Sequence, residues 1–174
     1  MSDLKKYIRS IPDFPKPGIC FYDITTLLQH PIGFKLALDE MEKYVRSKKP
    51  DAIVAIESRG FIFGAAIADR LHIGLVTVRK PGKLPAETIS QEYSLEYGTD
   101  SIEIHTDALK KGDKVVIVDD LIATGGTLKA ACDLVEKLGA EVVGISAVID
   151  LEFLPWRNLL SKYDVNCLIA YSSE

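Results

Sequence analysis

The sequence predicts an α/β protein with a mostly parallel central sheet flanked by helices. Three features favour this fold: apolar runs rich in Val and Ile recur along the 174 residues, amphipathic helical patterns separate them, and Gly or Pro follows those patterns. Uninterrupted apolar runs are typical of parallel strands that are covered on both faces. Strands and helices in alternation form such a sheet through crossover connections.

Five strands are predicted from the apolar runs, four of them strong and the last one weaker. They cover residues 52–56, 75–78, 114–118, 142–149 and 167–171. Helices are predicted between them, because apolar residues recur there at three- and four-residue intervals. These helices cover 34–45, which Pro50 closes, then 61–71, and finally 128–138, where Gly139 suits a left-handed C-terminal cap.

Two segments interrupt the alternation. Residues 11–31 contain Pro12, Pro15, Pro17 and Gly18, and residues 79–100 contain two further prolines and two glycines. A long connection in a compact domain is typically either a functional lid or disordered, and alternating residues at 93–97 and 102–105 predict a hairpin beside it. We therefore expect a single domain over 1–174, with an N-terminal hood (residues 11–31) and a flexible lid (residues 79–100).

Composition narrows the possible functions. Lys and Arg total 21 against 25 Asp and Glu, which gives a net charge of −4, whereas a nucleic-acid-binding domain is normally basic. Cys20, Cys132 and Cys167 have neither disulfide-framework nor zinc-site spacing. No apolar stretch approaches the ~20 residues of a membrane span. We expect a soluble, cytoplasmic protein that binds neither nucleic acid nor membrane.

The most informative segment follows the predicted strand 114–118 and reads Asp119-Asp120-Leu121-Ile122-Ala123-Thr124-Gly125-Gly126-Thr127. A strand that ends in two acids presents them where open α/β sheets bind ligands. Glycines allow close backbone approach, and the free N–H groups of a helix start favour an anion. Carboxylates accept hydrogen bonds from sugar hydroxyls, so the expected ligand is a phosphorylated sugar.

The same residues allow other interpretations. The acids alone would serve as a helix cap, with the glycines forming an ordinary turn. The segment lacks the Lys of a P-loop, and the chain has no GxGxxG pattern, which disfavours a dinucleotide site. A second candidate segment, Glu57-Ser58-Arg59-Gly60, places a guanidinium between a strand and a helix, where it suits a phosphate. A surface ion pair is the alternative for Arg59.

These segments together resemble the type I phosphoribosyltransferases, and the resemblance covers nearly the whole chain. It is closest to the members of that family that act on adenine. Four segments carry it, in the order that the family has: Phe14-Pro15-Lys16-Pro17-Gly18 with Phe21 and Asp23, then Glu57-Ser58-Arg59-Gly60-Phe61, then Arg79-Lys80-Pro81-Gly82-Lys83-Leu84-Pro85 with Tyr93 to Gly98, and the run from Asp119 to Thr127.

The resemblance implies a role for each matching residue. Asp119 and Asp120 bind the ribose hydroxyls, and the 5′-phosphate is bound by Ala123, Thr124, Gly125, Gly126 and Thr127. Pyrophosphate is bound by Glu57, Ser58, Arg59, Gly60, Arg79, Lys80 and Lys83. Glu96 and Arg59 are the expected catalytic residues. The base is bound by Cys20, Phe21, Tyr22 and Leu151. The family often has Arg where this chain has Tyr22, which favours a backbone contact there.

The resemblance also implies a reaction. Adenine displaces pyrophosphate from phosphoribosyl pyrophosphate and forms AMP, with Mg²⁺ bound through the substrate, and the family is usually dimeric. Two alternatives stay open. One is transfer to xanthine, hypoxanthine or guanine. The other is a non-catalytic sensor of phosphoribosyl pyrophosphate, although such sensors typically add a DNA-binding module for which this chain has little room.

Overall fold

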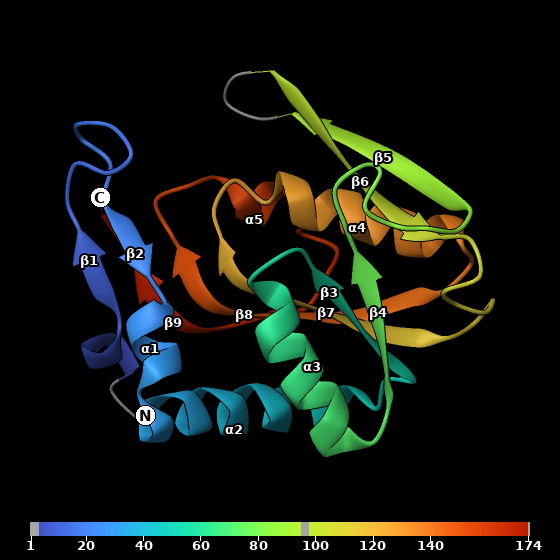
Figure 1. Ribbon diagram of the computed structural model, residues 1–174, viewed down its shortest axis with the longest axis horizontal. Helices are drawn as coiled ribbons and strands as arrows, with labels where there is room; N and C mark the ends of the chain where they lie inside the picture. The colour runs from blue at the N-terminus through green and yellow to red at the C-terminus, as the bar shows by residue number, and fades with distance from the viewer. Residues whose placement is uncertain (1–3, 95–97, 174) are drawn as a thin grey trace.

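The computed structural model describes residues 4–94 and 98–173. At its centre lies a five-stranded sheet in the order β4-β3-β7-β8-β9, with all neighbouring strands parallel (Figure 1). The strands are β3 (Ala52–Ile56), β4 (Gly74–Val78), β7 (Lys114–Ile122), β8 (Glu141–Leu151) and β9 (Val165–Tyr171). The predicted parallel sheet and all five of its strands are confirmed.

Two strands differ from the prediction in an informative way. β7 was expected to end at Val118, but it continues to Ile122, because Asp119, Leu121 and Ile122 keep pairing with β8. The two acids therefore lie within the strand and not beyond its end. β4 was expected to be buried, yet its first residues are exposed, because the strand forms the edge of the sheet.

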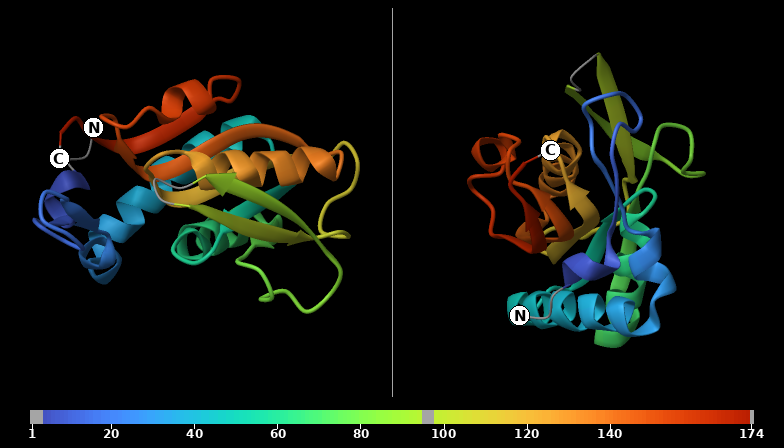
Figure 2. Two further views of the ribbon diagram at one scale, coloured as in Figure 1. Left: turned by 90° about the horizontal axis from the view of Figure 1, so that it is seen from above. Right: turned by 90° about the vertical axis from the view of Figure 1, so that its left-hand side faces the viewer.

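The three predicted helices are confirmed and lie on opposite faces of the sheet (Figure 2). α2 (Pro31–Lys48) and α3 (Gly60–Leu71) cover one face, and α4 (Gly126–Lys137) covers the other. Gly139 takes φ 83°, and its N–H donates to the Glu136 carbonyl at 2.9 Å. The predicted left-handed end of α4 is therefore present.

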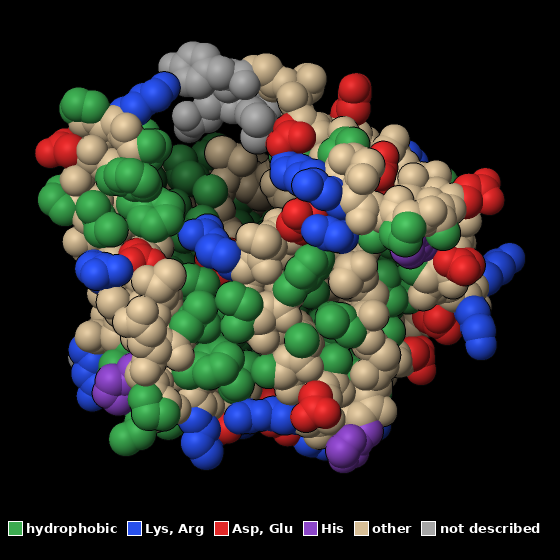
Figure 3. Space-filling model, viewed as in Figure 1, with side chains coloured by type: hydrophobic (Ala, Val, Ile, Leu, Met, Phe, Trp, Pro, Cys, Tyr) green, Lys and Arg blue, Asp and Glu red, His purple; other side chains and the backbone are tan. Residues whose placement is uncertain are grey.

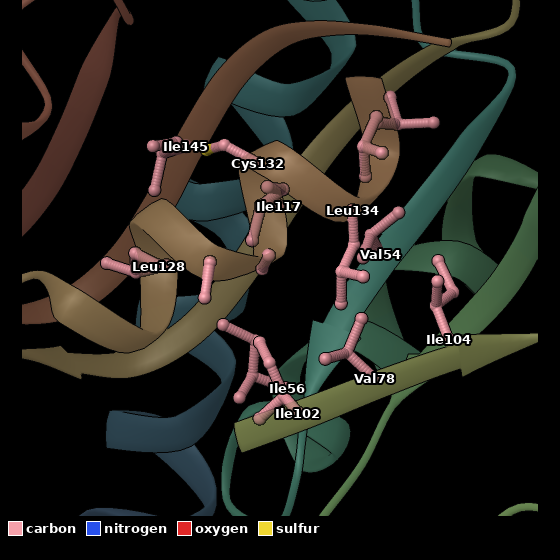
Figure 4. Packing of buried hydrophobic residues seen from close by; sticks show 14 of the residues in the cluster. Val54, Ile56, Val78, Ile102, Ile104, Ile117, Leu128, Cys132, Leu134 and Ile145 are labelled. Carbon is pink, nitrogen blue, oxygen red and sulfur yellow. The ribbon is translucent and has the colours of Figure 1, made fainter. Parts of the chain in front are cut away.

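Two apolar cores follow from the alternation of side chains along the strands. Ile53 and Val116 face α2 and α3, whereas Val54 and Ile117 face α4. Figure 4 shows this second core, into which a strand outside the sheet also inserts Ile102 and Ile104. This strand is β6 (Thr99–His105), which pairs antiparallel with β5 (Thr88–Ser94). A hairpin is therefore present and anchored in the core, but its first strand begins earlier than expected, at Thr88, and residues 95–97 of the expected strand 93–97 lie outside the described part of the chain.

The N-terminal segment forms a small unit at one end of the sheet (Figure 1). A 3-10 helix, η1 (Leu4–Tyr7), leads into β1 (Arg9–Ile11), which pairs antiparallel with β2 (Phe21–Asp23) before α1 (Thr25–Gln29). The Asp23 carboxylate accepts hydrogen bonds from the Arg9 guanidinium and from both the N–H and the hydroxyl of Thr25. These bonds join β1, β2 and α1. Between β8 and β9 lies α5 (Trp156–Leu159).

Within residues 4–94 and 98–173, no helix combines the length and the apolar character that crossing a bilayer requires.

Candidate active site

The strand order creates a natural ligand site between β3 and β7. From β3 the chain moves outward to β4, and from β7 it moves outward in the other direction, to β8 and β9. The connecting helices α3 and α4 cover opposite faces, so a crevice opens at the carboxyl ends of β3 and β7. Ligands of open α/β sheets bind at such a reversal of strand order.

A cavity of about 170 Å³ occupies this position. Its walls come from the ends of β3 and β7, from the segment after β4 and from the β5–β6 hairpin. They comprise Ile56, Glu57, Ser58, Arg59, Lys80, Tyr93, Ile102, Asp119, Asp120, Leu121 and Thr127. A second hollow of about 90 Å³ is lined by Asp119 and by residues 121–128. The two hollows share Asp119, Leu121 and Thr127 and therefore adjoin.

The paired acids Asp119 and Asp120 lie in the cavity wall and have shifted pKa values. Asp120 is only 3% exposed, and Asp119 is half-buried. Burial raises the pKa of both carboxyls; the charge of Asp120 raises the pKa of Asp119 further, whereas Arg59 opposes the rise at Asp120. Asp120 Oδ2 is buried and lies 2.9 Å from Arg59 Nε, an ion pair that lacks good hydrogen-bond geometry.

Arg59 connects the acids with the hood. Its Nε lies 2.9 Å from Asp120 Oδ2, and its guanidinium carbon lies 5.7 Å from the centre of the Phe21 ring. The ion pair of Arg59 therefore lies in the cavity wall, where the Arg59 side chain is 40% exposed and its partner Asp120 is buried. This contact brings the hood strand β2 close to the paired acids.

The glycine-rich loop turns directly into α4. Gly125 takes φ 82° and is the N-cap of α4, and no side chain caps the helix. The acids are therefore not a helix cap, which removes that alternative. A Cβ on Gly126 would lie 3.1 Å from the Ser94 carbonyl oxygen, so the end of β5 lies against the loop. The N–H groups of this helix start are available to an anion.

The segments expected at the pyrophosphate are partly bound to each other. The Glu57 carboxylate accepts from Arg79 Nε at 3.0 Å, from Arg79 Nη2 at 3.3 Å and from the Lys80 N–H at 3.1 Å. The bonds from Arg79 hold the pKa of Glu57 below its ordinary value. The Glu57–Ser58 peptide is cis. Lys83 is exposed, and its carbonyl accepts from Arg79 Nη1. Arg79 and Lys83 thus do not line the cavity, whereas Ser58, Arg59 and Lys80 do.

The residues expected at the base differ in their surroundings. Phe21 is half-buried and faces Arg59, whereas Tyr22 is 6% exposed, stacks on Tyr171 at 3.7 Å and donates to the Ser173 carbonyl. The Tyr22 side chain therefore points into the protein, which leaves only its backbone for a ligand. Cys20 and Leu151 are partly buried against the core that faces α2 and α3.

Two residues near the cavity were given no site role from the sequence, although Tyr93 begins one of the segments that carry the resemblance. Tyr93 lines the cavity, and its hydroxyl accepts from Lys80 Nζ at 2.8 Å. Asp100 also binds Lys80. The alternation around Tyr93 indicated a strand, but nothing local to Asp100 indicates that its partner lies 20 residues earlier. The predicted catalytic residue Glu96 lies outside the described residues.

Comparison with known proteins defines first the class and then the family. Residues 23–164, more than half of the chain, match the model of the phosphoribosyl transferase domain, so the protein is a phosphoribosyltransferase. An adenine phosphoribosyltransferase of Agathobacter rectalis is 55% identical over 174 residues, with 100% of each chain covered. The chain belongs to the adenine phosphoribosyltransferase family and is a transferase enzyme.

Solved structures agree with this assignment. The adenine phosphoribosyltransferase of Thermoanaerobacter pseudethanolicus matches with a TM-score of 0.94 and 53% identity, over 97% of this chain and 98% of that one. The enzyme of Saccharomyces cerevisiae, complexed with adenine and D-2,5-dideoxy-2,5-imino-altritol 1,6-bisphosphate, matches with a TM-score of 0.90 and 41% identity, over 96% of this chain and 97% of that one.

Proposed function

We propose that this protein transfers the 5-phosphoribosyl group of phosphoribosyl pyrophosphate to adenine, which yields AMP and pyrophosphate, and that the reaction takes place in the cavity between β3 and β7. The observation that carries the proposal is the pairing of two adjacent acids, one half-buried and one buried, with a glycine-rich helix start at one reversal of strand order. The acids suit a sugar diol and the helix start suits its phosphate, so a phosphorylated sugar satisfies both.

We assign the ribose to Asp119 and Asp120 and the 5′-phosphate to the loop of residues 123–127. The carboxylates accept hydrogen bonds from the 2′ and 3′ hydroxyls. At the other end, the α4 macrodipole and the backbone N–H groups stabilise the phosphate, with the Thr124 and Thr127 hydroxyls as further donors. Because the two hollows share Asp119, one ligand spans both of them.

We assign the pyrophosphate to residues 57–60 together with Lys80. Arg59 and Lys80 are the cationic side chains in the cavity wall among the described residues. Arg79 reaches the substrate only by exchanging its bonds to Glu57, and Lys83 only by a movement of its exposed segment. We therefore expect Arg59 and Lys80 to contribute more to pyrophosphate binding than Arg79 and Lys83.

The site suits a magnesium ion that arrives with the substrate. Carboxylate oxygens are preferred Mg²⁺ ligands, and the cavity wall presents two adjacent carboxylates, on Asp119 and Asp120. An ion that enters with the substrate would have these two carboxylates as neighbouring anions. When bound, it neutralises charge on the leaving pyrophosphate.

The reaction forms one bond and breaks another at C1 of the ribose. Adenine N9 donates an electron pair to C1, the bond from C1 to the pyrophosphate oxygen breaks, and the N9 proton leaves. Positive charge develops on the sugar in the transition state, and the adjacent carboxylates stabilise it. Closure of the lid over the site would exclude water, which otherwise attacks such a sugar.

The base is assigned to the hood, where Phe21 presents its ring near Arg59. Backbone groups at Cys20 and Tyr22 read the edge of the purine, and Leu151 covers its other face. A site that hydrogen-bonds the exocyclic amine of adenine rejects purines that lack it, because its own polar groups are then left unpaired. This selectivity distinguishes the proposal from transfer to hypoxanthine, guanine or xanthine.

The test is to incubate the protein with Mg²⁺, phosphoribosyl pyrophosphate and one purine base at a time, and to identify the nucleotide by chromatography. We expect AMP from adenine and only traces of nucleotide from the other bases. A larger yield from hypoxanthine, guanine or xanthine would assign the enzyme to that base. No nucleotide from any base, together with retained binding of phosphoribosyl pyrophosphate, would identify a sensor.

Glu96 is proposed, from the family resemblance, to move the proton on the purine. The variant Glu96→Gln keeps the size of the side chain and removes its acid–base function. We expect kcat to fall about 10²-fold or more, with little change in the dissociation constant of phosphoribosyl pyrophosphate. Glu92→Gln, at an exposed residue of β5, is the matched control and should retain kcat. An unchanged kcat in Glu96→Gln would exclude this role.

A homodimer is proposed as the assembly, and exposed apolar residues on α3 and β4 support it. Ile62 is 41% exposed and Leu75 is 38% exposed, and Figure 3 shows hydrophobic side chains gathered over α3. Exposed apolar patches on an edge strand and its neighbouring helix are typical of interfaces. We expect Ile62→Asp to raise the dimer dissociation constant about tenfold or more, because dimer formation would then bury the carboxylate charge at residue 62.

Light scattering coupled to size-exclusion chromatography checks this prediction. Ile32→Asp is the control, since Ile32 is 61% exposed on α2. It should leave the dimer intact at concentrations at which Ile62→Asp is monomeric. A wild-type monomer, or an Ile62→Asp dimer of unchanged affinity, would contradict the proposed interface.

A cytoplasmic location is proposed on the basis of thiol chemistry. Cys20, Cys132 and Cys167 are free, and reducing compartments preserve free thiols. Cell fractionation followed by immunodetection tests the location directly.

A further inference from the structure

The short helix α5 lies directly against the phosphate loop, although about 30 residues of sequence separate them. A Cβ on Gly125 would lie 3.0 Å from Trp156 Cβ and 3.5 Å from Trp156 Cα. Trp156 itself is 5% exposed and belongs to the core beneath α4. Since Gly125 is the left-handed residue that sets the direction of the first α4 N–H groups, Trp156 supports the part of the loop on which those groups depend.

Asp150 fixes the indole in place. Trp156 Nε1 donates to Asp150 Oδ1 at 2.6 Å, and this hydrogen bond is buried. Arg157 Nη2 donates to Asp150 Oδ2 at 2.6 Å, and the Arg157 guanidinium lies 4.5 Å from the Trp156 ring centre. A carboxylate that is only 3% exposed is costly unless it is paired, and here each oxygen has a donor. The position and orientation of Trp156 are thereby defined.

The backbone of Asp150 is also attached to the other end of the loop. It lies in β8 opposite Ile122, the last residue of β7 and the residue just before Ala123. The phosphate loop is therefore attached on both sides of residues 123–124: through the β-ladder at Ile122 and through Trp156 at Gly125. Neither Asp150 nor Trp156 lines the cavity or the adjoining hollow.

We propose that Asp150 and Trp156 are positioning residues that hold the 5′-phosphate loop in its binding conformation. The inference rests on the proposed function, because it assigns the loop to the 5′-phosphate of the substrate. The two side chains act through the contact of Trp156 with Gly125 and touch no substrate. Their effect falls on ligands that carry this phosphate and leaves the affinity for the free base unchanged.

The experiment compares Trp156→Phe and Asp150→Asn with the wild type by steady-state kinetics. Trp156→Phe retains an aromatic ring and removes the indole donor, whereas Asp150→Asn retains the shape of the side chain and removes its charge. Both are expected to raise the KM for phosphoribosyl pyrophosphate roughly three- to tenfold, since each alters the buried hydrogen bond between Trp156 and Asp150. The KM for adenine should stay within about twofold of the wild-type value.

Controls separate positioning from a general loss of stability. Val135→Ala removes buried volume near the other end of α4 and should lower the melting temperature without changing either KM. Ribose 5-phosphate, measured by calorimetry, should bind the two variants more weakly by the same factor as the substrate. The double variant should be no worse than the more affected single variant, because both substitutions alter the same bond.

The outcomes distinguish the inference from the proposed function. A wild-type protein that makes no nucleotide from any base contradicts the proposed function. An active wild type whose variants keep the KM for phosphoribosyl pyrophosphate, or raise both KM values equally, overturns the inference alone. Should Trp156→Phe fail to fold, Asp150→Asn decides the question, because its side chain has the same shape as that of the native residue.

Discussion

Replacing Asp119 with Asn is expected to remove most of the activity and, at the same time, to raise the melting temperature. The amide can still accept from the Asp120 N–H, which donates to Asp119 Oδ1 at 2.9 Å, but it carries no charge for the sugar. Hydrogen bonds to charged groups contribute about 1.5–3 kcal/mol, so kcat/KM should fall about 10- to 100-fold. Steady-state kinetics with saturating adenine measures this fall.

The gain in stability follows from the direction of the pKa shift. Burial and the charge of Asp120 raise the pKa of Asp119 in the folded protein. A raised carboxyl pKa means that the folded state binds the proton more tightly than the unfolded state, so stability is lost as the pH rises through the folded pKa. The Asn variant avoids this loss. We expect its melting temperature to exceed that of the wild type by about 2–4 °C per kcal/mol regained.

The pH dependence and a matched control test this explanation. The difference in melting temperature should be small in acid, where the wild-type carboxyl is neutral, and should widen towards neutral pH. Asp39→Asn is the control, because hydrogen bonding to Lys35 lowers the pKa of Asp39, so that its ionised form stabilises the fold. That variant should lose a little stability and keep its activity. A destabilised Asp119→Asn would contradict the explanation from the pKa of Asp119. An Asp119→Asn variant with full activity would refute the assignment of Asp119 to the ribose.

The second large effect is expected from a single methyl group at Gly60. A Cβ there would lie 2.8 Å from the Val118 carbonyl oxygen and 2.9 Å from Asp119 Oδ1. One of these two neighbours must therefore shift, and the Asp119 carboxylate is more mobile than the Val118 carbonyl. We expect Gly60→Ala to raise the KM for phosphoribosyl pyrophosphate tenfold or more, since an oxygen displaced by ~1 Å no longer meets the ribose hydroxyl.

Gly64→Ala provides a control on the same helix. A Cβ at Gly64 would lie 2.6 Å from Ala55 Cβ in the core and would not meet the acids. Overpacking of this kind costs about 1–3 kcal/mol, partly offset by the better helix propensity of Ala. Both variants should therefore unfold at lower denaturant concentrations, but only Gly60→Ala should bind substrate poorly. Equal KM values in the two variants would show that Gly60 serves packing alone.

The two cores illustrate why the sheet was predictable. The run at 52–56 is apolar throughout, so it can be buried on both faces, and residues 115–118 repeat the pattern after Lys114. Such patterns are local, and they predict the fold because the burial of each residue depends largely on its own polarity. Leu75 is exposed and not buried as its apolar run predicts, because its strand lies at the edge of the sheet. Position within a sheet depends on pairing partners that a local pattern does not reveal.

The sequence by itself determined the order of strands and helices along the chain, the acids and glycines of the ligand loop, and the family. Each of these depends on residues that are close together in the sequence. Only the tertiary structure decided that Arg59 binds Asp120, that Arg79 is bound by Glu57, and that Trp156 supports Gly125. These contacts join segments that are distant in the chain. Their geometry is fixed by how the helices and strands pack together, and no local pattern of residues records it.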